Sequence, residues 1–148
     1  MRKKSKVILV EDDLILAKGT AKLLERLGGY QVEITFKCEK IFSLSQAGEV
    51  DIILMDINLP GAVWNGDEVS GSDLSRILKS QQPTKNIPII LLTAYAIKSE
   101  RDILLQQSLA DEFFLKPITN YSALIALMED LISNQYIASM EGESSANT

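Results

Sequence analysis

The chain has 148 residues, which corresponds to about one domain, long enough to bury a core without disulfides or structural metals. It carries 20 acidic and 15 basic residues, and this net charge of −5 argues against binding to a nucleic-acid backbone. It contains no histidine, which excludes histidine-dependent nucleophilic catalysis, histidine metal ligands and phosphohistidine. The single cysteine, Cys38, excludes an internal disulfide and a thiolate zinc cluster, so a reducing cytoplasm is the expected location.

No membrane partner is expected either. No apolar stretch approaches the ~18 residues that a membrane-spanning helix needs. The basic start of the chain, residues 1–6, is followed by an apolar run that is too short for a signal peptide.

Five strand candidates alternate with segments of helical periodicity. Nearly continuous apolar runs at 7–10, 52–55 and 89–92 are typical of strands covered on both faces. The run at 30–36 alternates polar and apolar residues, which predicts a strand at a sheet edge, and a further weak run lies at 113–115.

Helical periodicity predicts helices at 38–47, 72–80 and 99–108, with Ser99 and Thr119 as helix N-caps. In the last helical segment, one apolar face is formed by Leu124, Leu127, Met128, Leu131 and Ile132. In the first, ended by Gly28 and Gly29, we expect the core-facing stripe to be Leu16, Thr20, Leu23, Leu24 and Leu27.

This order predicts an α/β fold, a doubly wound five-stranded parallel sheet with right-handed crossovers and helices on both faces. We expect one domain over residues 1–138 and a disordered tail over 139–148, which is small and polar. The segment 61–71 is longer than the usual βα loop of roughly 2–6 residues, which predicts an extended loop after the third strand.

Polar side chains follow four of the predicted strands. Residues 11–13 (Glu-Asp-Asp), Asp56, Thr93 and Lys116 come directly after them, and the carboxyl ends of parallel strands share one edge of a sheet. Clustered carboxylates need a neutralising cation, and oxygen ligands favour Mg²⁺, with Mn²⁺ possible. A carboxylate can attack phosphorus while Lys116 and Thr93 hold the phosphoryl oxygens, so the sequence predicts a phosphoryl-acceptor site.

Four motifs carry a resemblance to a known family: Val-Glu-Asp-Asp at 10–13, Met-Asp-Ile-Asn-Leu-Pro at 55–60, Leu-Thr-Ala at 92–94 and Phe-Leu-Lys-Pro at 114–117. In this order they resemble the receiver domain of bacterial two-component response regulators, over about residues 6–135. The resemblance implies a flavodoxin-like (βα)5 receiver fold. It also implies a phosphoryl group accepted from a partner histidine kinase or phosphotransfer protein.

The resemblance further implies a role for each matching position. Asp56 is the phosphoacceptor, and the metal site comprises Asp56, Asp12, Glu11 through water, and the backbone carbonyl of Asn58. Thr93 and Lys116 bind the phosphoryl group, and the small side chain of Ala94 leaves room for it. Thr93 and Phe113 are the switch residues, which change position on phosphorylation. Asn58 and Tyr95 control access of water, and the bulk of Tyr95 predicts a long-lived phosphoryl group.

On this reading, phosphorylation reshapes the face formed by the fourth helix (99–108), the fifth strand (113–115) and the last helix. That face binds an unidentified target protein, and a homodimer through it is also possible. The chain is then a single-domain signalling switch without an output domain. It is not an enzyme beyond its own phosphorylation and dephosphorylation.

Several other functions are compatible with parts of this pattern. A phosphorelay intermediate remains an alternative, as does a phosphate-independent adaptor, although Asp56, Thr93 and Lys116 argue against the adaptor. A Mg²⁺-dependent aspartyl phosphatase of the haloacid-dehalogenase type needs a second aspartate where Asn58 stands. A flavodoxin-like cofactor binder is disfavoured because the acids at 11–13 would repel a phosphate.

The sequence departs from the family pattern at two places. Ser70 and Gly71 best fill the place of a family glycine, which makes the preceding loop longer than usual by about seven residues. We expect Trp64 in this loop to pack locally, or to contact a kinase or target or shield the phosphate. Leu109 stands where the family usually has glycine, which predicts an altered turn.

Overall fold

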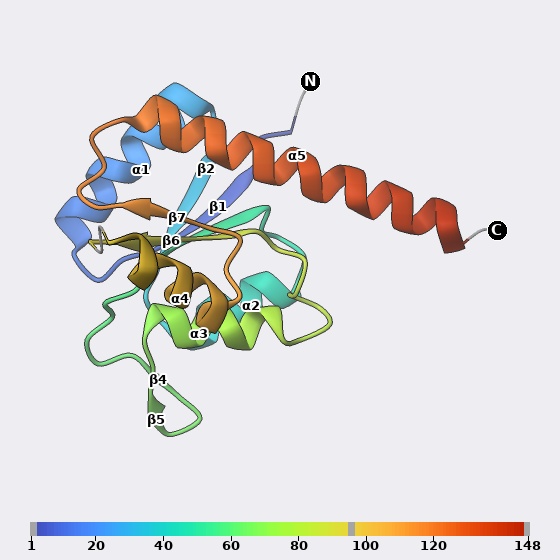
Figure 1. The fold of residues 1–148 in the computed structure, drawn as a ribbon. Coiled ribbons are helices and arrows are strands. Elements are labelled where there is room, and N and C mark those ends of the chain that lie inside the picture. The colour runs from blue at the N-terminus through green and yellow to red at the C-terminus, as the bar shows by residue number, and fades with distance from the viewer. Residues whose placement is uncertain (1–2, 95–96, 147–148) are drawn as a thin grey trace.

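The computed structural model describes residues 3–94 and 97–146, and Figure 1 shows their arrangement. One parallel sheet has the strand order β2-β1-β3-β6-β7, with β1 Lys6–Val10, β2 Gln31–Ile34, β3 Ile52–Asp56, β6 Ile89–Thr93 and β7 Glu112–Leu115. The helices are α1 Leu14–Gly28, α2 Cys38–Gln46, α3 Gly71–Lys79, α4 Lys98–Ser108 and α5 Tyr121–Ala146. The predicted doubly wound, five-stranded α/β fold is confirmed.

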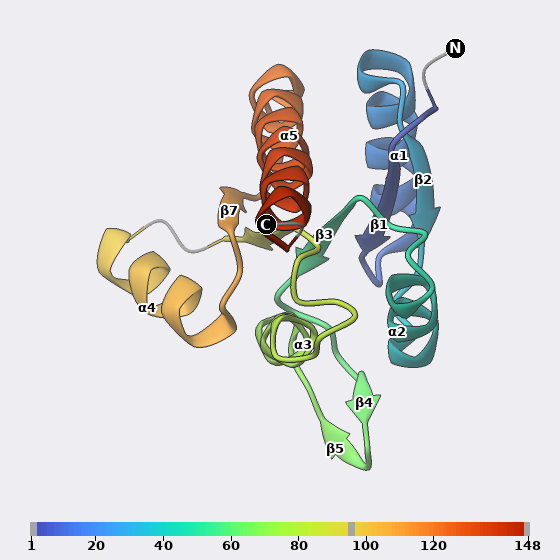
Figure 2. The ribbon, with the colours of Figure 1, turned by 90° about the vertical axis from the view of Figure 1, so that its right-hand side faces the viewer.

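The sheet separates two hydrophobic cores (Figure 2). α1 and α5 cover one face, where Leu24 and Leu124 pack with Leu54 of the sheet. α2, α3 and α4 cover the other face, where Leu74 packs with Ile53. β3 and β6 are buried along their whole length, so the side chains of these two central strands are covered by helices on both faces of the sheet. None of the helices in the described part of the chain combines the length and apolar character of a bilayer-spanning segment.

The apolar stripe expected for α1 is only partly correct. The side chains that α1 buries are Ala17, Thr20, Ala21 and Leu24, whereas Leu16, Leu23 and Leu27 are exposed. The two small alanines allow the helix to lie close to the sheet, and this rotation directs three leucines outward. The predicted end of the helix is confirmed, since Gly29 has a left-handed backbone (φ 68°) and its N–H donates to the Glu25 carbonyl.

Both predicted N-caps are wrong. The residue before α4 is Ile97, which makes no side-chain cap. At α5 the cap is Asn120, whose Oδ1 accepts a hydrogen bond from the Ala123 N–H at 3.0 Å. The sequence pattern located both helices but not the residue at which each begins, because several Ser, Thr and Asn residues compete for a cap position.

α5 continues to Ala146, into the segment 139–148 for which the sequence predicts a disordered tail. The helix is nucleated by its buried first half, which contains Leu124 and Met128. Extending an existing helix is far less costly than starting one, and residues 133–146 contain no proline to stop it.

The long loop after β3 contains a short hairpin of β4 (Val63–Trp64) and β5 (Asp67–Glu68), which projects from the body in Figure 1. Its turn is Asn65-Gly66, with φ of 52° and 85°. An Asn-Gly pair is a strong hairpin signal that the sequence analysis missed. The Trp64 ring stacks on Phe42 of α2, with centroids 4.1 Å apart. Local packing of Trp64 is thus confirmed, and its contact with a partner stays a prediction.

The two departures from the family pattern have different outcomes. Leu109 keeps a left-handed backbone (φ 60°) as the C-cap of α4, so the glycine-type turn is retained without glycine. Gly71 begins α3, and its N–H donates to the Ile57 carbonyl at 2.8 Å. A Cβ on Gly71 would lie 2.0 Å from the backbone carbonyl oxygen of Asp56, so only glycine fits there.

We therefore expect Gly71→Ala to displace the backbone at the end of β3 and to lower the free energy of unfolding by about 2 kcal/mol. Gly19→Ala is the matched control. A Cβ there meets nothing within 4 Å in the described part of the chain, so it should stabilise α1 by about 0.5–1 kcal/mol. Urea denaturation measures both changes, and equal stability of the two variants would contradict the close contact.

Candidate functional site

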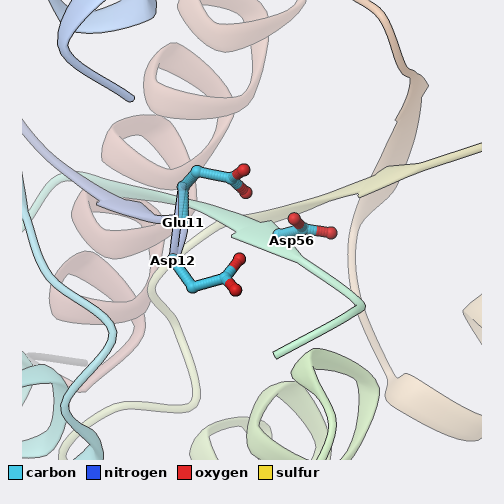
Figure 3. A group of neighbouring side chains, drawn as sticks. All are labelled: Glu11, Asp12 and Asp56. Carbon is cyan, nitrogen blue, oxygen red and sulfur yellow. The ribbon is translucent and has the colours of Figure 1, made fainter. Parts of the chain in front are cut away.

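Three carboxylates meet at the carboxyl ends of β1 and β3 (Figure 3). Glu11 and Asp12 follow β1 directly, and Asp56 is the last residue of β3. Their ligand oxygens all lie within 4.8 Å of one another. Glu11 and Asp56 are buried, whereas Asp12 is exposed. The neighbouring Asp13 is the N-cap of α1, because its Oδ1 accepts a hydrogen bond from the Leu16 N–H.

Lys116 brings a positive charge to this cluster. Its Nζ donates to Asp56 Oδ2 at 2.8 Å and lies 3.5 Å from Glu11 Oε2. The residue directly follows β7, and its backbone N–H donates to the Thr93 carbonyl at 2.8 Å, which ties the two strand ends together. Four of the predicted site residues are therefore adjacent in space although they come from three different strand ends.

The environment of Asp56 favours its ionised form. Burial raises the pKa of this carboxyl, but hydrogen bonds from Glu11, from Lys116 and from the Asn58 N–H, together with the Lys116 charge, lower it below its ordinary value overall. The Asn58 N–H lies 3.1 Å from Asp56 Oδ1. Both oxygens of Asp56 are thereby oriented, and the group is an ionised carboxylate, which is the form that can act as a nucleophile.

Glu11 has the opposite character. Burial, then the hydrogen bond and the charge of Asp56, raise the pKa of Glu11 to about 8, against the opposing effect of Lys116. This raised pKa favours the protonated form of Glu11 near neutral pH, beside an ionised Asp56. The charge of a divalent cation can take the place of that proton. An all-oxygen donor set suits Mg²⁺, so the residues present fit such an ion.

The remaining predicted residues are placed around this cluster. Thr93 is buried at the end of β6, the strand beside β3, and Ala94 follows it at the surface. Phe113 lies on β7, with the Arg101 guanidinium of α4 4.5 Å from its ring centroid. Tyr95 lies outside the described residues.

The sequence analysis missed an apolar cavity of about 300 Å³ beside the site. Lys116 and Glu11 border it, and its apolar walls include Leu9, Leu92 and Ile118. These side chains come from separate elements, so no local sequence pattern could reveal the cavity.

Comparison with known proteins identifies the family. The chain matches the family model of the response regulator receiver domain over residues 7–129. The polar-differentiation response regulator DivK of Brucella abortus is 32% identical over 113 residues, which cover 76% of this chain and 85% of DivK. The hybrid signal transduction histidine kinase M of Dictyostelium discoideum is 33% identical over 131 residues, which cover 87% of this chain but only 5% of the kinase.

Solved structures show the same fold. A receiver domain of a sensor histidine kinase from Pseudomonas aeruginosa aligns with a TM-score of 0.72 at 25% identity, covering 88% of this chain and 99% of that domain. That domain was determined with a magnesium ion coordinated in its active-site cleft. A CheY-like receiver domain protein of Methanospirillum hungatei aligns with a TM-score of 0.73 at 22% identity, covering 92% of this chain and 99% of that protein.

The chain therefore belongs to the response regulator receiver domain family. Receiver domains are phosphorylatable signalling switches of two-component systems rather than typical enzymes, and they interact with histidine kinases and phosphotransfer proteins.

Replacing Lys116 tests its electrostatic role. In metal-free protein, Lys116→Met should raise the pKa of Asp56, because a hydrogen-bonding cation is lost from a buried carboxylate. NMR titration of the side-chain carboxyl carbons measures this change. Lys85→Met, which removes an exposed charge from another part of the surface, should leave the titration of Asp56 unaltered. An unchanged Asp56 in Lys116→Met would show that this ion pair does not set its ionisation.

Proposed function

We propose that this chain is a signalling switch that accepts a phosphoryl group on Asp56 from a histidine kinase or phosphotransfer protein, in the presence of Mg²⁺. The observation that carries the proposal is an ionised, buried Asp56 held between Lys116 and the acids Glu11 and Asp12. Phosphorylation then alters a surface that binds a target protein. The buried free thiol of Cys38 suits a reducing compartment, so we place the switch in the cytoplasm.

The transfer needs a nucleophile, charge compensation and a donor. A carboxylate oxygen of Asp56 attacks phosphorus, the bond from phosphorus to the donor's nitrogen breaks, and the donor imidazole leaves with the electron pair. Lys116 is positioned to stabilise a phosphoryl oxygen, and the Thr93 hydroxyl is proposed to bind another. Asp12, Asp56, Glu11 through water and the Asn58 carbonyl would hold Mg²⁺, which supplies positive charge for the phosphoryl oxygens.

The signal is proposed to leave through α4, β7 and α5, by a shift of Thr93 and a change in the packing of Phe113. Phe113 is half-buried against the core and is covered by Arg101 of α4, so a change in its burial would move that helix. This is the proposed target-binding face. The sequence also allows a homodimer through it, but the charges along α5 favour a different pairing.

Three alternative functions make different demands on the chain. A phosphorelay intermediate would pass its phosphoryl group to a second phosphotransfer protein, whereas a phosphate-independent adaptor would bind its partner equally well without Asp56. An aspartyl phosphatase would need an acid where Asn58 stands, and an amide cannot donate a proton to a leaving group.

Incubation with acetyl phosphate and Mg²⁺ tests the proposal directly. Intact-protein mass spectrometry should show one added phosphoryl group on the wild type, and none on Asp56→Asn or after chelation of the metal. Asp12→Asn should reduce the uptake rate by at least about tenfold, because a metal ligand is weakened. Asp13→Asn is the matched control and should react normally, since asparagine also caps a helix.

Equal labelling of the wild type and Asp56→Asn would refute the assignment of the phosphoacceptor. Absence of labelling in all variants, with Mg²⁺ binding shown to be intact by calorimetry, would favour the adaptor.

A further inference from the structure

Two helices carry most of the large apolar side chains that the fold leaves exposed. Among the residues whose exposure the structure describes, eight of the fourteen such side chains lie on α1 or on the second half of α5. On α1 they are Leu14, Ile15, Leu16, Leu23 and Leu27, and on α5 they are Tyr136, Ile137 and Met140. Scattered exposed apolar residues are normal in a monomer, but continuous apolar surface marks an interaction site.

On α1, three of these residues form a ridge along the helix with a gap in the middle. Ile15, Gly19, Leu23 and Leu27 follow one another at four-residue spacing, and the Ile15 side chain is 87% exposed. Glycine inside a helix destabilises it relative to alanine. Apart from its chain neighbours and the backbone of α1 itself, nothing in the described part of the chain lies within 4 Å of the place where a Gly19 Cβ would stand. The fold itself therefore gives no reason for Gly19, whereas close approach of a second helix does.

The α1 ridge, defined here by these four residues, is flanked by positive charge. Lys18, Lys22 and Arg26 are exposed and also recur at four-residue spacing, against one acid, Glu25. A helix that packs on this ridge should therefore combine apolar residues with acidic ones.

The second half of α5 has this composition. Residues 133–146, which form this half, contain no lysine or arginine and two acids, Glu141 and Glu143. Ile132, Tyr136 and Met140 follow one another at four-residue spacing, with Tyr136 and Met140 exposed. In Figure 1 this half of α5 projects beyond the sheet and the other helices, where its own chain does not cover it.

The lengths of the two surfaces also match. Residues 133–146 span about 21 Å as a helix, and the 15 residues of α1 span about 22 Å. Because both helices lie on the same face of the sheet, two copies related by a twofold axis can exchange these contacts reciprocally.

We propose that two copies of this chain form a symmetric dimer in which the second half of α5 from each copy packs on the α1 ridge of the other. Gly19 provides the close approach, and Lys18, Lys22 and Arg26 face the acidic helix. Pairing of α5 with α5 would instead place acids beside acids with no basic residue between them, which is unfavourable.

Analytical ultracentrifugation of the full chain over a range of concentrations tests the dimer. The wild type should dimerise, and the dimer should weaken when salt is raised to about 0.5 M, since exposed charges are then screened. Gly19→Gln should weaken dimerisation by at least about tenfold while raising the melting temperature of the monomer, because glutamine is a better helix former. Ser99→Gln enlarges an exposed residue of α4 and should dimerise like the wild type.

A mixing experiment distinguishes this arrangement from other dimers. Lys22→Glu/Arg26→Glu alters α1, and Tyr136→Ser/Met140→Ser alters α5; each double variant alone should associate at least about tenfold more weakly than the wild type. An equimolar mixture should associate more tightly than either variant alone, because one unaltered α5–α1 contact is restored in the mixed dimer.

A monomeric wild type at all concentrations would overturn the proposal. So would normal dimerisation of either double variant, which would indicate another interface, such as the face of α4, β7 and α5. A mixture no tighter than its components would also overturn it. None of these outcomes depends on phosphorylation, so the dimer and the proposed switch are tested separately.

Discussion

The ion pair between Lys116 and Asp56 determines the chemistry of the site. Asp56 is buried beside a second acid, Glu11, and two neighbouring buried carboxylates cannot both ionise without compensating positive charge. Lys116 supplies part of that compensation, and the raised pKa of Glu11 favours its protonated form at neutral pH. Asp56 is then an ionised carboxylate that can attack phosphorus. The proton on Glu11 can be replaced by the charge of a divalent cation.

The fold positions these groups by bringing strand ends together. β1 and β3 are adjacent and parallel, so the residues that follow them meet at one edge, and β7 delivers Lys116 from the far side of β6. The first residue of α3 also packs against the end of β3. Gly71 lies so close to the backbone carbonyl oxygen of Asp56 that a Cβ would not fit between them. The inserted hairpin leaves this contact intact, because Trp64 anchors it on α2 instead.

The sheet and the acidic site could be predicted because both leave strong local signals. Strands covered on both faces must be continuously apolar. A polar residue directly after such a strand must lie where the carboxyl ends of the strands meet. Most of the differences between prediction and structure concern features set by tertiary packing. The outward leucines of α1, such as Leu23, follow from how closely Ala17 and Ala21 let the helix approach the sheet, which periodicity alone does not reveal. The length of α5 depends on its buried first half, which is distant in sequence from its end. The Asn65-Gly66 turn, by contrast, is a local signal for a hairpin.

The most direct test of the central claim is to count the protons released when Mg²⁺ binds. Calorimetry at pH 7 in buffers of different ionisation enthalpy gives this number. Because the pKa of Glu11 is raised to about 8 in the metal-free protein, we predict release of close to one proton per bound Mg²⁺ by the wild type and none by Glu11→Gln. Binding of Mg²⁺ to the wild type without proton release would contradict the account. It would show that the metal ion does not replace a proton that neutralises Glu11 beside Asp56.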